Sequence, residues 1–154
     1  MDFDFSDEQR QLKDSLDRLL ADQYSELSTR FAYQKEPGGY SAKVWQSLAD
    51  LGALAIPFAE EHGGLGQGAI ETMIVMESLG RALSIDPFVP TVVLAGGVLR
   101  HAGSAAQQSE LTPGIVAGTT KLALAHLERD ARYDLAHVGT TAKGDGKGGF
   151  VLEG

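Results

Sequence analysis

The sequence predicts a mainly α fold: an antiparallel helical bundle followed by a few β-strands of an incomplete β-domain. Before residue 118, apolar residues recur at helical spacing in several segments, and short linkers rich in glycine, proline and capping residues separate them. After Gly118 the pattern changes to short apolar or alternating runs around a glycine-rich loop, which is typical of strands. The predicted domains are therefore residues 1–118 and residues 119–154.

The first helix is predicted to begin at Ser6, because serine is a good N-cap and the acidic residues Asp7 and Glu8 follow it. Its apolar face is formed by leucines at helical spacing: Leu12, Leu16, Leu19 and Leu20. Phe3 and Phe5 are expected to pack against its first turn. A second helical piece is predicted over about residues 25–34.

A third helix is predicted to begin at Ser41 and to end before Gly52, with one shared apolar face: Val44, Trp45, Leu48 and Leu51. Residues 70–83 and 92–99 are apolar nearly all round, which indicates helices in the middle of a bundle. A shorter helix is predicted over residues 105–111, followed by a turn at 112–114 and a last helical piece that ends at Gly118.

Three strands are predicted in the second part, over residues 121–127, 136–142 and 149–152, with the glycine-rich run 144–149 as a hairpin loop. Three strands alone leave unpaired edges and an uncovered sheet. We therefore expect this chain to be the front part of a longer protein. The alternative is a β-appendix on the bundle.

Composition narrows the class of protein. The chain has 154 residues, of which 43% are hydrophobic and 22% are charged, as in globular proteins. Its net charge of −8 argues against a nucleic-acid partner, and the absence of cysteine excludes disulfides and thiol chemistry. No apolar run approaches the roughly 20 residues of a membrane span, and the N-terminus lacks the basic start of a signal peptide. We predict no membrane span and a cytoplasmic location.

Some polar and glycine patterns are weak candidates for sites. Gly64-x-Gly66-x-Gly68 lacks the spacing of a dinucleotide fingerprint and the strand before it, so a structural turn is favoured. Residues 60–62 (EEH) are metal ligands in type, but neighbouring residues on a loop point apart, and no metal site is predicted. The histidines His101, His126 and His137 are expected to be satisfied or at the surface.

Four motifs in register carry a resemblance to a known family. They are MDFDFSDEQRQL at residues 1–12, WQSLADLG at 45–52, EEHGGLG at 60–66 and MESLGRA at 76–82. Together they resemble the amino-terminal helical domain of the flavin-dependent acyl-CoA dehydrogenases over about the first 120 residues. Beyond Gly118 the chain resembles the start of that family's middle β-domain. The finer pattern is similar to bacterial members that work as unequal subunit pairs, including those acting on sterol-derived thioesters.

The resemblance implies a reaction and a cofactor. The reaction is α,β-dehydrogenation of an acyl-CoA thioester with hydride transfer to FAD. The catalytic base is a glutamate of the family's carboxy-terminal domain, so no catalytic residue is assigned in this chain. FAD is expected for the full-length protein and not for these 154 residues. The resemblance also implies fatty acid or sterol degradation, an electron-transfer acceptor, and a homo-oligomer or a heteromer with a sister subunit.

The resemblance places cofactor-binding positions in the segment LERDARYD, residues 127–134, where the family reads Thr-Glu-Pro-x-x-Gly-Ser-Asp. The cofactor-binding positions are Leu127, Glu128 and Tyr133. Only the glutamate and the aspartate of the pattern are retained. The hydroxyl expected at Leu127 is missing, and Arg132 replaces a glycine, whose close approach to a ligand an arginine reproduces poorly.

The family's acyl cavity is lined by the helix after a proline, which here is Pro90. The substrate-binding positions implied are Thr91, Leu94, Ala95 and Val98, and the small residues around them suit a wide cavity. The alternative for each is simple helix–helix packing.

Three functions stay open at this point. The chain is the amino-terminal part of an acyl-CoA dehydrogenase, a non-catalytic subunit of that family, or a helical interaction module without chemistry. Because the family's other domains would cover this one, we also expect the 154-residue chain to expose apolar surface and to self-associate.

Overall fold

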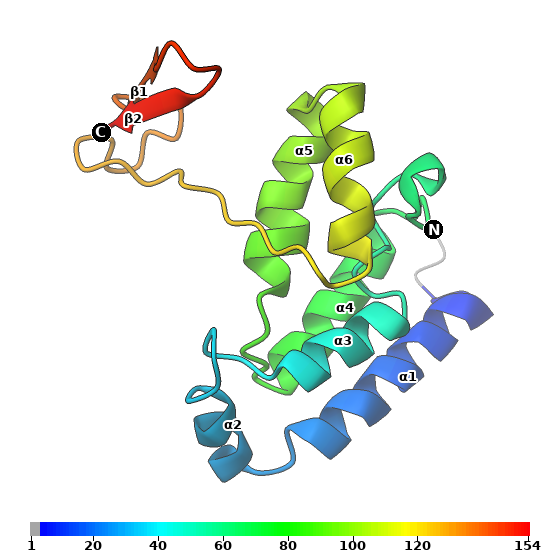
Figure 1. Cartoon of the computed structure of the whole chain (residues 1–154). Helices are drawn as coiled ribbons and strands as arrows, with labels where there is room; N and C mark the ends of the chain where they lie inside the picture. The colour runs from blue at the N-terminus through cyan, green and yellow to red at the C-terminus, as the bar shows by residue number, and fades with distance from the viewer. Residues whose placement is uncertain (1–3) are drawn as a thin grey trace. The chain divides into compact units, whose positions relative to one another are not determined.

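The computed structural model describes residues 4–154 and divides the chain into two compact units, the second of which runs from Leu124 to Gly154 (Figure 1). The first unit is helical. It contains α1 (Asp7–Gln23), α2 (Leu27–Tyr33), α3 (Ala42–Asp50), the 3-10 turn η1 (Glu60–His62), α4 (Ala69–Arg81), the π-helix η2 (Val89–Ala95), α5 (Gly96–Ala102) and α6 (Ala105–Val116). The second unit contains only the strands β1 (Thr141–Gly144) and β2 (Phe150–Glu153). The predicted mainly α fold is confirmed.

The predicted start of α1 is confirmed by a capping box. The Ser6 hydroxyl accepts the Gln9 N–H at 3.2 Å, and the Gln9 side chain accepts the Ser6 N–H at 3.0 Å. Phe5, which is predicted to pack against the first turn of α1, is partly buried against the core of the unit. Phe3, its predicted companion, lies outside the described residues.

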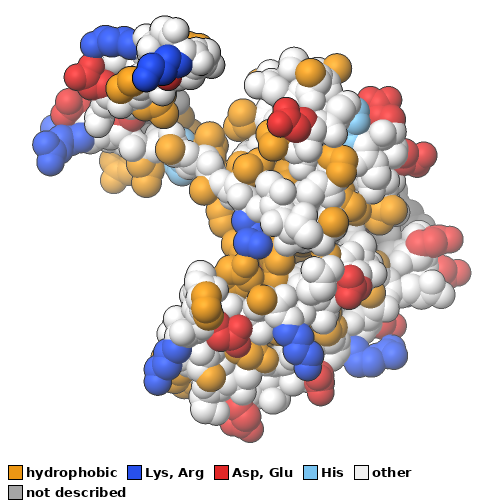
Figure 2. Space-filling view, in the orientation of Figure 1, with side chains coloured by type: hydrophobic (Ala, Val, Ile, Leu, Met, Phe, Trp, Pro, Cys, Tyr) orange, Lys and Arg blue, Asp and Glu red, His pale blue; other side chains and the backbone are white. Residues whose placement is uncertain are grey.

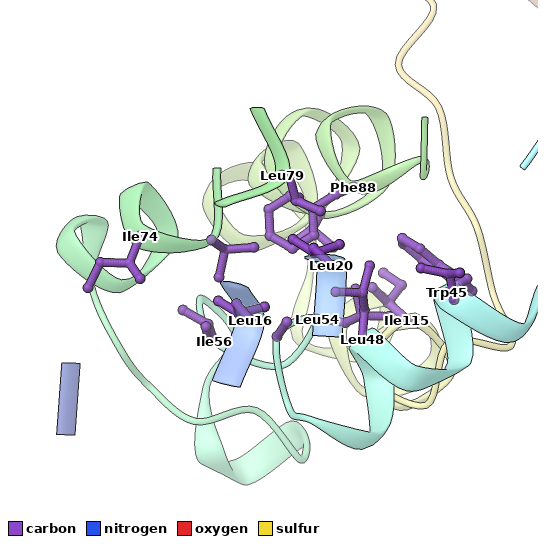
Figure 3. Packing of buried hydrophobic residues seen from close by; sticks show 14 of the residues in the cluster. Leu16, Leu20, Trp45, Leu48, Leu54, Ile56, Ile74, Leu79, Phe88 and Ile115 are labelled. Atoms are coloured by element: carbon purple, nitrogen blue, oxygen red, sulfur yellow. The ribbon is translucent and has the colours of Figure 1, made fainter. Parts of the chain in front are cut away.

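The core of the helical unit lies between α1, α3, α4 and α6 and the loop after α3 (Figure 3). Its largest fully buried side chains are Trp45, Phe58, Phe88, Leu16, Leu20, Leu48, Leu54, Ile56, Ile74 and Ile115. α1 contacts α3 and α4, and α5 lies against α6. The two-residue link from α5 to α6 makes that pair antiparallel.

Helix α3 is confirmed, with one correction at its end. Val44, Trp45 and Leu48 are buried, and Gly52 takes the left-handed φ of +82° expected of a residue that ends a helix. Leu51 does not share the buried face. The helix ends at Asp50, and the chain turns at Gly52, so Leu51 stays 36% exposed.

The prediction that residues 70–83 are surrounded by protein is wrong for this chain. Ile74 and Val75 are fully buried on one side of α4, but Ile70 and Met73 are 52% and 49% exposed on the other. Figure 2 shows hydrophobic side chains that reach the surface of the helical unit on the face in view. An apolar pattern all round a helix therefore does not show which neighbours cover it.

The predicted turn at residues 112–114 is absent. α6 continues through Pro113 to Val116 as one helix. Proline removes one backbone donor from a helix, but Thr112 and Ile115 on either side of it are both buried, and the Pro113 carbonyl still accepts the Ala117 N–H at 3.0 Å. The packing of these side chains outweighs the one lost bond, and the chain leaves the helix at Gly118 as predicted.

The predicted first strand, residues 121–127, is not formed. No neighbouring strand pairs with it among the described residues, and Leu122 instead packs against the helical core. The second predicted strand begins later, at Thr141. The third is confirmed as β2, which pairs antiparallel with β1 from Thr141↔Glu153 to Gly144↔Phe150 around the predicted hairpin loop.

Candidate functional site

The four predicted substrate-binding residues lie on η2 and the start of α5, and the structure separates them into two groups. Leu94 and Val98 face outward, at 40% and 46% exposed, and Ala95 is partly buried beside them. Thr91 is fully buried, and its hydroxyl donates a 3.1 Å hydrogen bond to the carbonyl oxygen of Leu122. This hydrogen bond holds the segment after α6 against η2.

The π-helix decides which residues face outward. A π-helix makes backbone hydrogen bonds to the fifth residue back, so equivalent positions lie further apart than in an α-helix. Val89, Leu94 and Val98 are spaced by five and then four residues, and all three are more than a third exposed. Short π-helical segments often occur at functional sites. Here the wider turn creates one apolar stripe on the surface of the bundle.

A cavity of about 290 Å³ adjoins this stripe. Ala95 and Val98 line it on one side, and the remaining lining residues come from α5, α6 and the segment after them: Leu99, Ala102, Gly103, Gln107, Leu111 and Leu122. Most of these side chains are small or apolar. The site can hold hydrocarbon, and it offers little that could bind a charged group.

Two residues that the sequence analysis missed, Phe58 and Arg100, support η2 and α5 from behind. Gly96 is buried, and a Cβ there would lie 2.8 Å from Phe58 Cζ, so the absence of a side chain admits the phenyl ring. The Arg100 guanidinium lies 5.9 Å from the centre of that ring and donates to the Pro57 carbonyl at 3.1 Å. The glycine pair 96–97 was visible in the sequence, but its partner lies in a distant loop.

The predicted cofactor-binding residues lie in the second unit. Leu127 is 81% exposed and Tyr133 is fully exposed. Glu128 is half-buried, and a cavity of about 460 Å³ beside it is also lined by Arg129, His137 and Thr140. The structure thus places two of the three side chains at the surface with no polar partner among the contacts described for them.

The third residue, Glu128, binds the backbone further along the same loop, at residues 139 and 140. Its carboxylate accepts the backbone N–H groups of Thr140, at 3.0 Å, and of Gly139. These two bonds hold the pKa of Glu128 below its ordinary value. Because its oxygens are already engaged and negatively charged, Glu128 joins two parts of the loop and offers no donor to a ligand.

The backbone of this loop keeps a glycine-like conformation at Arg132, where φ is +49°. Left-handed backbone favours glycine, and the family pattern has a glycine at this position. Asp134 accepts the Ala136 N–H at 2.9 Å, so the two retained acidic residues both bind backbone. This agreement supports the alignment of residues 127–134 with the family pattern.

The residues present do not fit the flavin of FAD. A flavin ring is held by neutral donors to its ring nitrogens and carbonyls and by a backbone that approaches it closely. The Leu127 side chain has no polar atom, so only the backbone N–H of this residue can donate. The Glu128 carboxylate accepts only, and Arg132 adds a long side chain where the backbone is glycine-like. Tyr133 supplies the one hydroxyl of the predicted set, at the end of a bulky ring.

The other candidate motifs form structural turns. Glu60–His62 are the turn η1, in which the His62 Nε2 and the Glu61 Oε1 lie 3.4 Å apart. A Cβ at Gly64 would collide with the Phe58 carbonyl oxygen, which explains the glycine there. Within residues 4–154 no group of three His, Asp or Glu side chains could hold a metal ion.

Comparison with known proteins gives the family. Residues 6–119 match the model of the acyl-CoA dehydrogenase N-terminal domain. This chain belongs to the acyl-CoA dehydrogenase family. It is 33% identical over 149 residues to acyl-CoA dehydrogenase FadE29 of Mycobacterium tuberculosis, an alignment that covers 95% of this chain and 38% of that protein.

Two solved structures have the same fold as this chain. The ChsE4–ChsE5 complex from Mycobacterium tuberculosis matches with a TM-score of 0.80 and 27% identity, over 100% of this chain and 40% of that one. A variant of the Tcur3481–Tcur3483 steroid ACAD matches with a TM-score of 0.82 and 29% identity, over 96% and 39%. The chain thus spans about two fifths of the length of these relatives. None of the helices in the described part of the chain has the length and hydrophobicity needed to cross a bilayer.

Proposed function

We propose that this chain is the amino-terminal helical part of an acyl-CoA dehydrogenase and that it supplies one wall of the acyl pocket. The observation that carries the proposal is the apolar stripe of Val89, Leu94 and Val98 beside the 290 Å³ cavity. An uncovered apolar surface on a helical domain is suited to bind hydrocarbon. The reaction of the whole protein is α,β-dehydrogenation of an acyl-CoA thioester.

The contribution of this chain to that reaction is positional. Leu94 and Val98 would contact the acyl tail and keep water from it, and Ala95 would leave room for its bulk. Thr91 acts from behind, because its hydroxyl holds Leu122 at the edge of the cavity. The base, the thioester contacts and the electron-transfer acceptor belong to residues and partners outside this chain.

We further propose a bulky, sterol-like acyl group and an assembly of unequal subunits. Support comes from the small residues of the wall, Ala95, Gly96 and Gly97, and from two similar structures, a steroid ACAD and the ChsE4–ChsE5 complex. A homo-oligomer is the alternative assembly. The predicted cytoplasmic location stays a prediction.

The experiment is a substrate panel. The complete natural protein, purified with any co-encoded sister subunit, is assayed with an artificial electron acceptor on acyl-CoAs from short straight chains to sterol-derived side chains. Val98→Phe should lower kcat/KM for the bulky thioesters about tenfold or more relative to the short ones, because the ring fills the cavity. Ile70→Phe, at an equally exposed apolar position on α4, is the control and should leave the ratio unchanged.

An equal loss on every acyl-CoA, or no loss, would contradict the assignment of the wall. The 154-residue chain by itself is predicted to show no turnover in the same assay. Turnover above background would refute that prediction.

A second function, a non-catalytic subunit of the same family, is favoured by one observation. Of the cofactor-binding positions, Leu127 has no side-chain donor, Glu128 accepts only, and Tyr133 carries its hydroxyl on a bulky, fully exposed ring. The interaction module without chemistry has no comparable support.

A further inference from the structure

We infer that the loop of residues 127–134 does not hold a flavin, and that another chain carries the flavin of any dehydrogenase assembly that contains this protein. The inference rests on the proposed function for the assembly.

The backbone of the loop is formed and internally bonded. The Ala131 N–H donates to the Glu128 carbonyl at 3.2 Å, and the Asp134 N–H donates to the Ala131 carbonyl at 2.9 Å. The Glu128 carboxylate accepts the Thr140 N–H, and the Asp134 carboxylate accepts the Ala136 N–H. The residues that shape the loop are therefore in place, so a lost turn is not the reason for the misfit.

The donor chemistry is what has changed. The position for a neutral hydroxyl holds Leu127, which cannot donate from its side chain. The nearby hydroxyl of Thr140 belongs to the residue whose backbone N–H and side chain both act on Glu128. Among the loop residues, the remaining side-chain donors are the two cationic arginines, Arg129 and Arg132, and the exposed phenol of Tyr133.

The bulk of two side chains in the loop also argues against flavin binding. Arg132 adopts φ +49°, where an L side chain is strained and a glycine is at ease. The arginine side chain at this position hinders a close approach of a flavin ring to the backbone. Tyr133 replaces the compact hydroxyl of a serine with a ring that is fully exposed. Both substitutions add bulk at positions where the family pattern has a bare backbone and a small hydroxyl.

The test measures flavin content. The complete natural protein is expressed alone with added FAD, and the flavin per chain is counted from its visible absorbance after gel filtration. We expect a content far below one per chain. The triple variant Leu127→Thr, Arg132→Gly, Tyr133→Ser should raise the flavin content about tenfold or more, since it restores the hydroxyls and the bare backbone. Leu127→Thr alone should give a smaller rise.

Leu135→Thr is the matched control, because Leu135 is 77% exposed and lies just outside the loop. It should leave the flavin content unchanged. One flavin per chain in the natural protein purified alone would overturn the inference. So would a natural protein without flavin whose triple variant, with an unchanged thermal midpoint, gains none.

Co-expression with the sister subunit separates this inference from the proposed function. We expect one flavin for each pair of chains together with turnover of acyl-CoA. Flavin on the sister chain without any turnover would count against the proposed function and leave the inference intact. Turnover with flavin bound to both chains would overturn the inference and support the proposed function.

Discussion

The indole N–H of Trp45 on α3 donates a 2.9 Å hydrogen bond to the carbonyl oxygen of Gly118, a residue 73 positions further along the chain. Trp45 is almost fully buried, and Gly118 has a left-handed φ of +75°. A Cβ at Gly118 would lie 3.1 Å from the Cβ of Ala49. The end of α6 is thus held tightly against α3.

We expect Gly118→Ala to lower the free energy of unfolding by more than the about 1–2 kcal/mol of left-handed strain, because the new methyl group also crowds Ala49. Urea unfolding measures this. Gly39→Ala is the control, since Gly39 has a similar φ of +78° and open space around it. Equal losses in the two variants would show that the contact with α3 contributes nothing.

Alanine substitutions at the neighbouring glycines Gly96 and Gly97 of α5 should change stability in opposite directions. Gly96→Ala should cost about 1–3 kcal/mol, because its Cβ would lie 2.8 Å from Phe58 Cζ and 3.0 Å from the Thr91 carbonyl oxygen. Gly97→Ala meets nothing within 4 Å and should stabilise the helix by roughly 0.5–1 kcal/mol. Thermal or urea unfolding of both variants decides. The same sign for both would refute the tight packing of η2 and α5 on Phe58.

The buried Ser78 on α4 links α4 to α1, because its hydroxyl donates to Asp17 at 2.7 Å. Burial alone would raise the pKa of Asp17, but bonds from Lys13 and Ser78 outweigh it and hold the pKa below its ordinary value. A lowered folded-state pKa gives stability that is present above the unfolded pKa and is lost as pH falls through the folded pKa.

Ser78→Ala should therefore destabilise the bundle by about 1.5–3 kcal/mol at neutral pH. It should also flatten the loss of stability as the pH falls below the ordinary Asp value of 3.8, because the folded-state pKa of Asp17 then rises toward the unfolded one. Ser47→Ala is the control, since that hydroxyl bonds only to its own helix at the surface. If Ser78→Ala loses stability at acidic pH as steeply as the wild type does, the Ser78 hydrogen bond does not lower the pKa of Asp17.

The carboxylate of Asp86 gives a pH dependence of the opposite sign. One oxygen accepts the hydroxyls of Tyr24 and Ser84 at 2.7 Å and 2.6 Å, and the other is buried without a partner among the described residues. Burial raises the pKa of Asp86. With the folded pKa above the unfolded one, the helical unit gains stability as pH falls from neutral through the folded value.

Asp86→Asn should remove this gain, because the amide keeps an oxygen for Tyr24 and Ser84 but does not titrate. Unfolding free energies measured at neutral and mildly acidic pH test it. Asp14→Asn, at an exposed position of α1, should keep the gain. If the free energy of unfolding changes with pH equally in the wild type and in Asp86→Asn, the buried carboxylate of Asp86 is not the cause of the pH dependence.

The exposed side of α4 predicts self-association of the 154-residue chain. Ile70 and Met73 are half exposed and adjacent on that helix. Light scattering should therefore give a mass above 16.3 kDa, the mass of one chain. Ile70→Gln combined with Met73→Gln should move the mass toward that value. A monomer of wild type over a wide dilution range would count against the prediction.

The sequence predicted most of the helices because their signals are local. Ser6 is the predicted N-cap of α1, and Gly52 and Gly118 end their helices with left-handed backbone. The sequence grouped Thr91 with Leu94, Ala95 and Val98 and could not tell that Thr91 turns inward to Leu122, because the π-helix changes the spacing of its faces. The support from Phe58 and Arg100 was also missed, since those contacts join segments about forty residues apart.

What the sequence determined by itself was the family, the start of α1, the ends of α3 and α6 and most of the core, since capping, glycine conformation and apolar spacing act over a few residues. Tertiary structure alone decided the rest. α6 runs through Pro113 because Thr112 and Ile115 are both buried, and residues 121–127 form no strand because no neighbour offers them a ladder. In both cases the outcome depends on atoms from distant parts of the chain, whose free energy of packing or pairing exceeds the local preference.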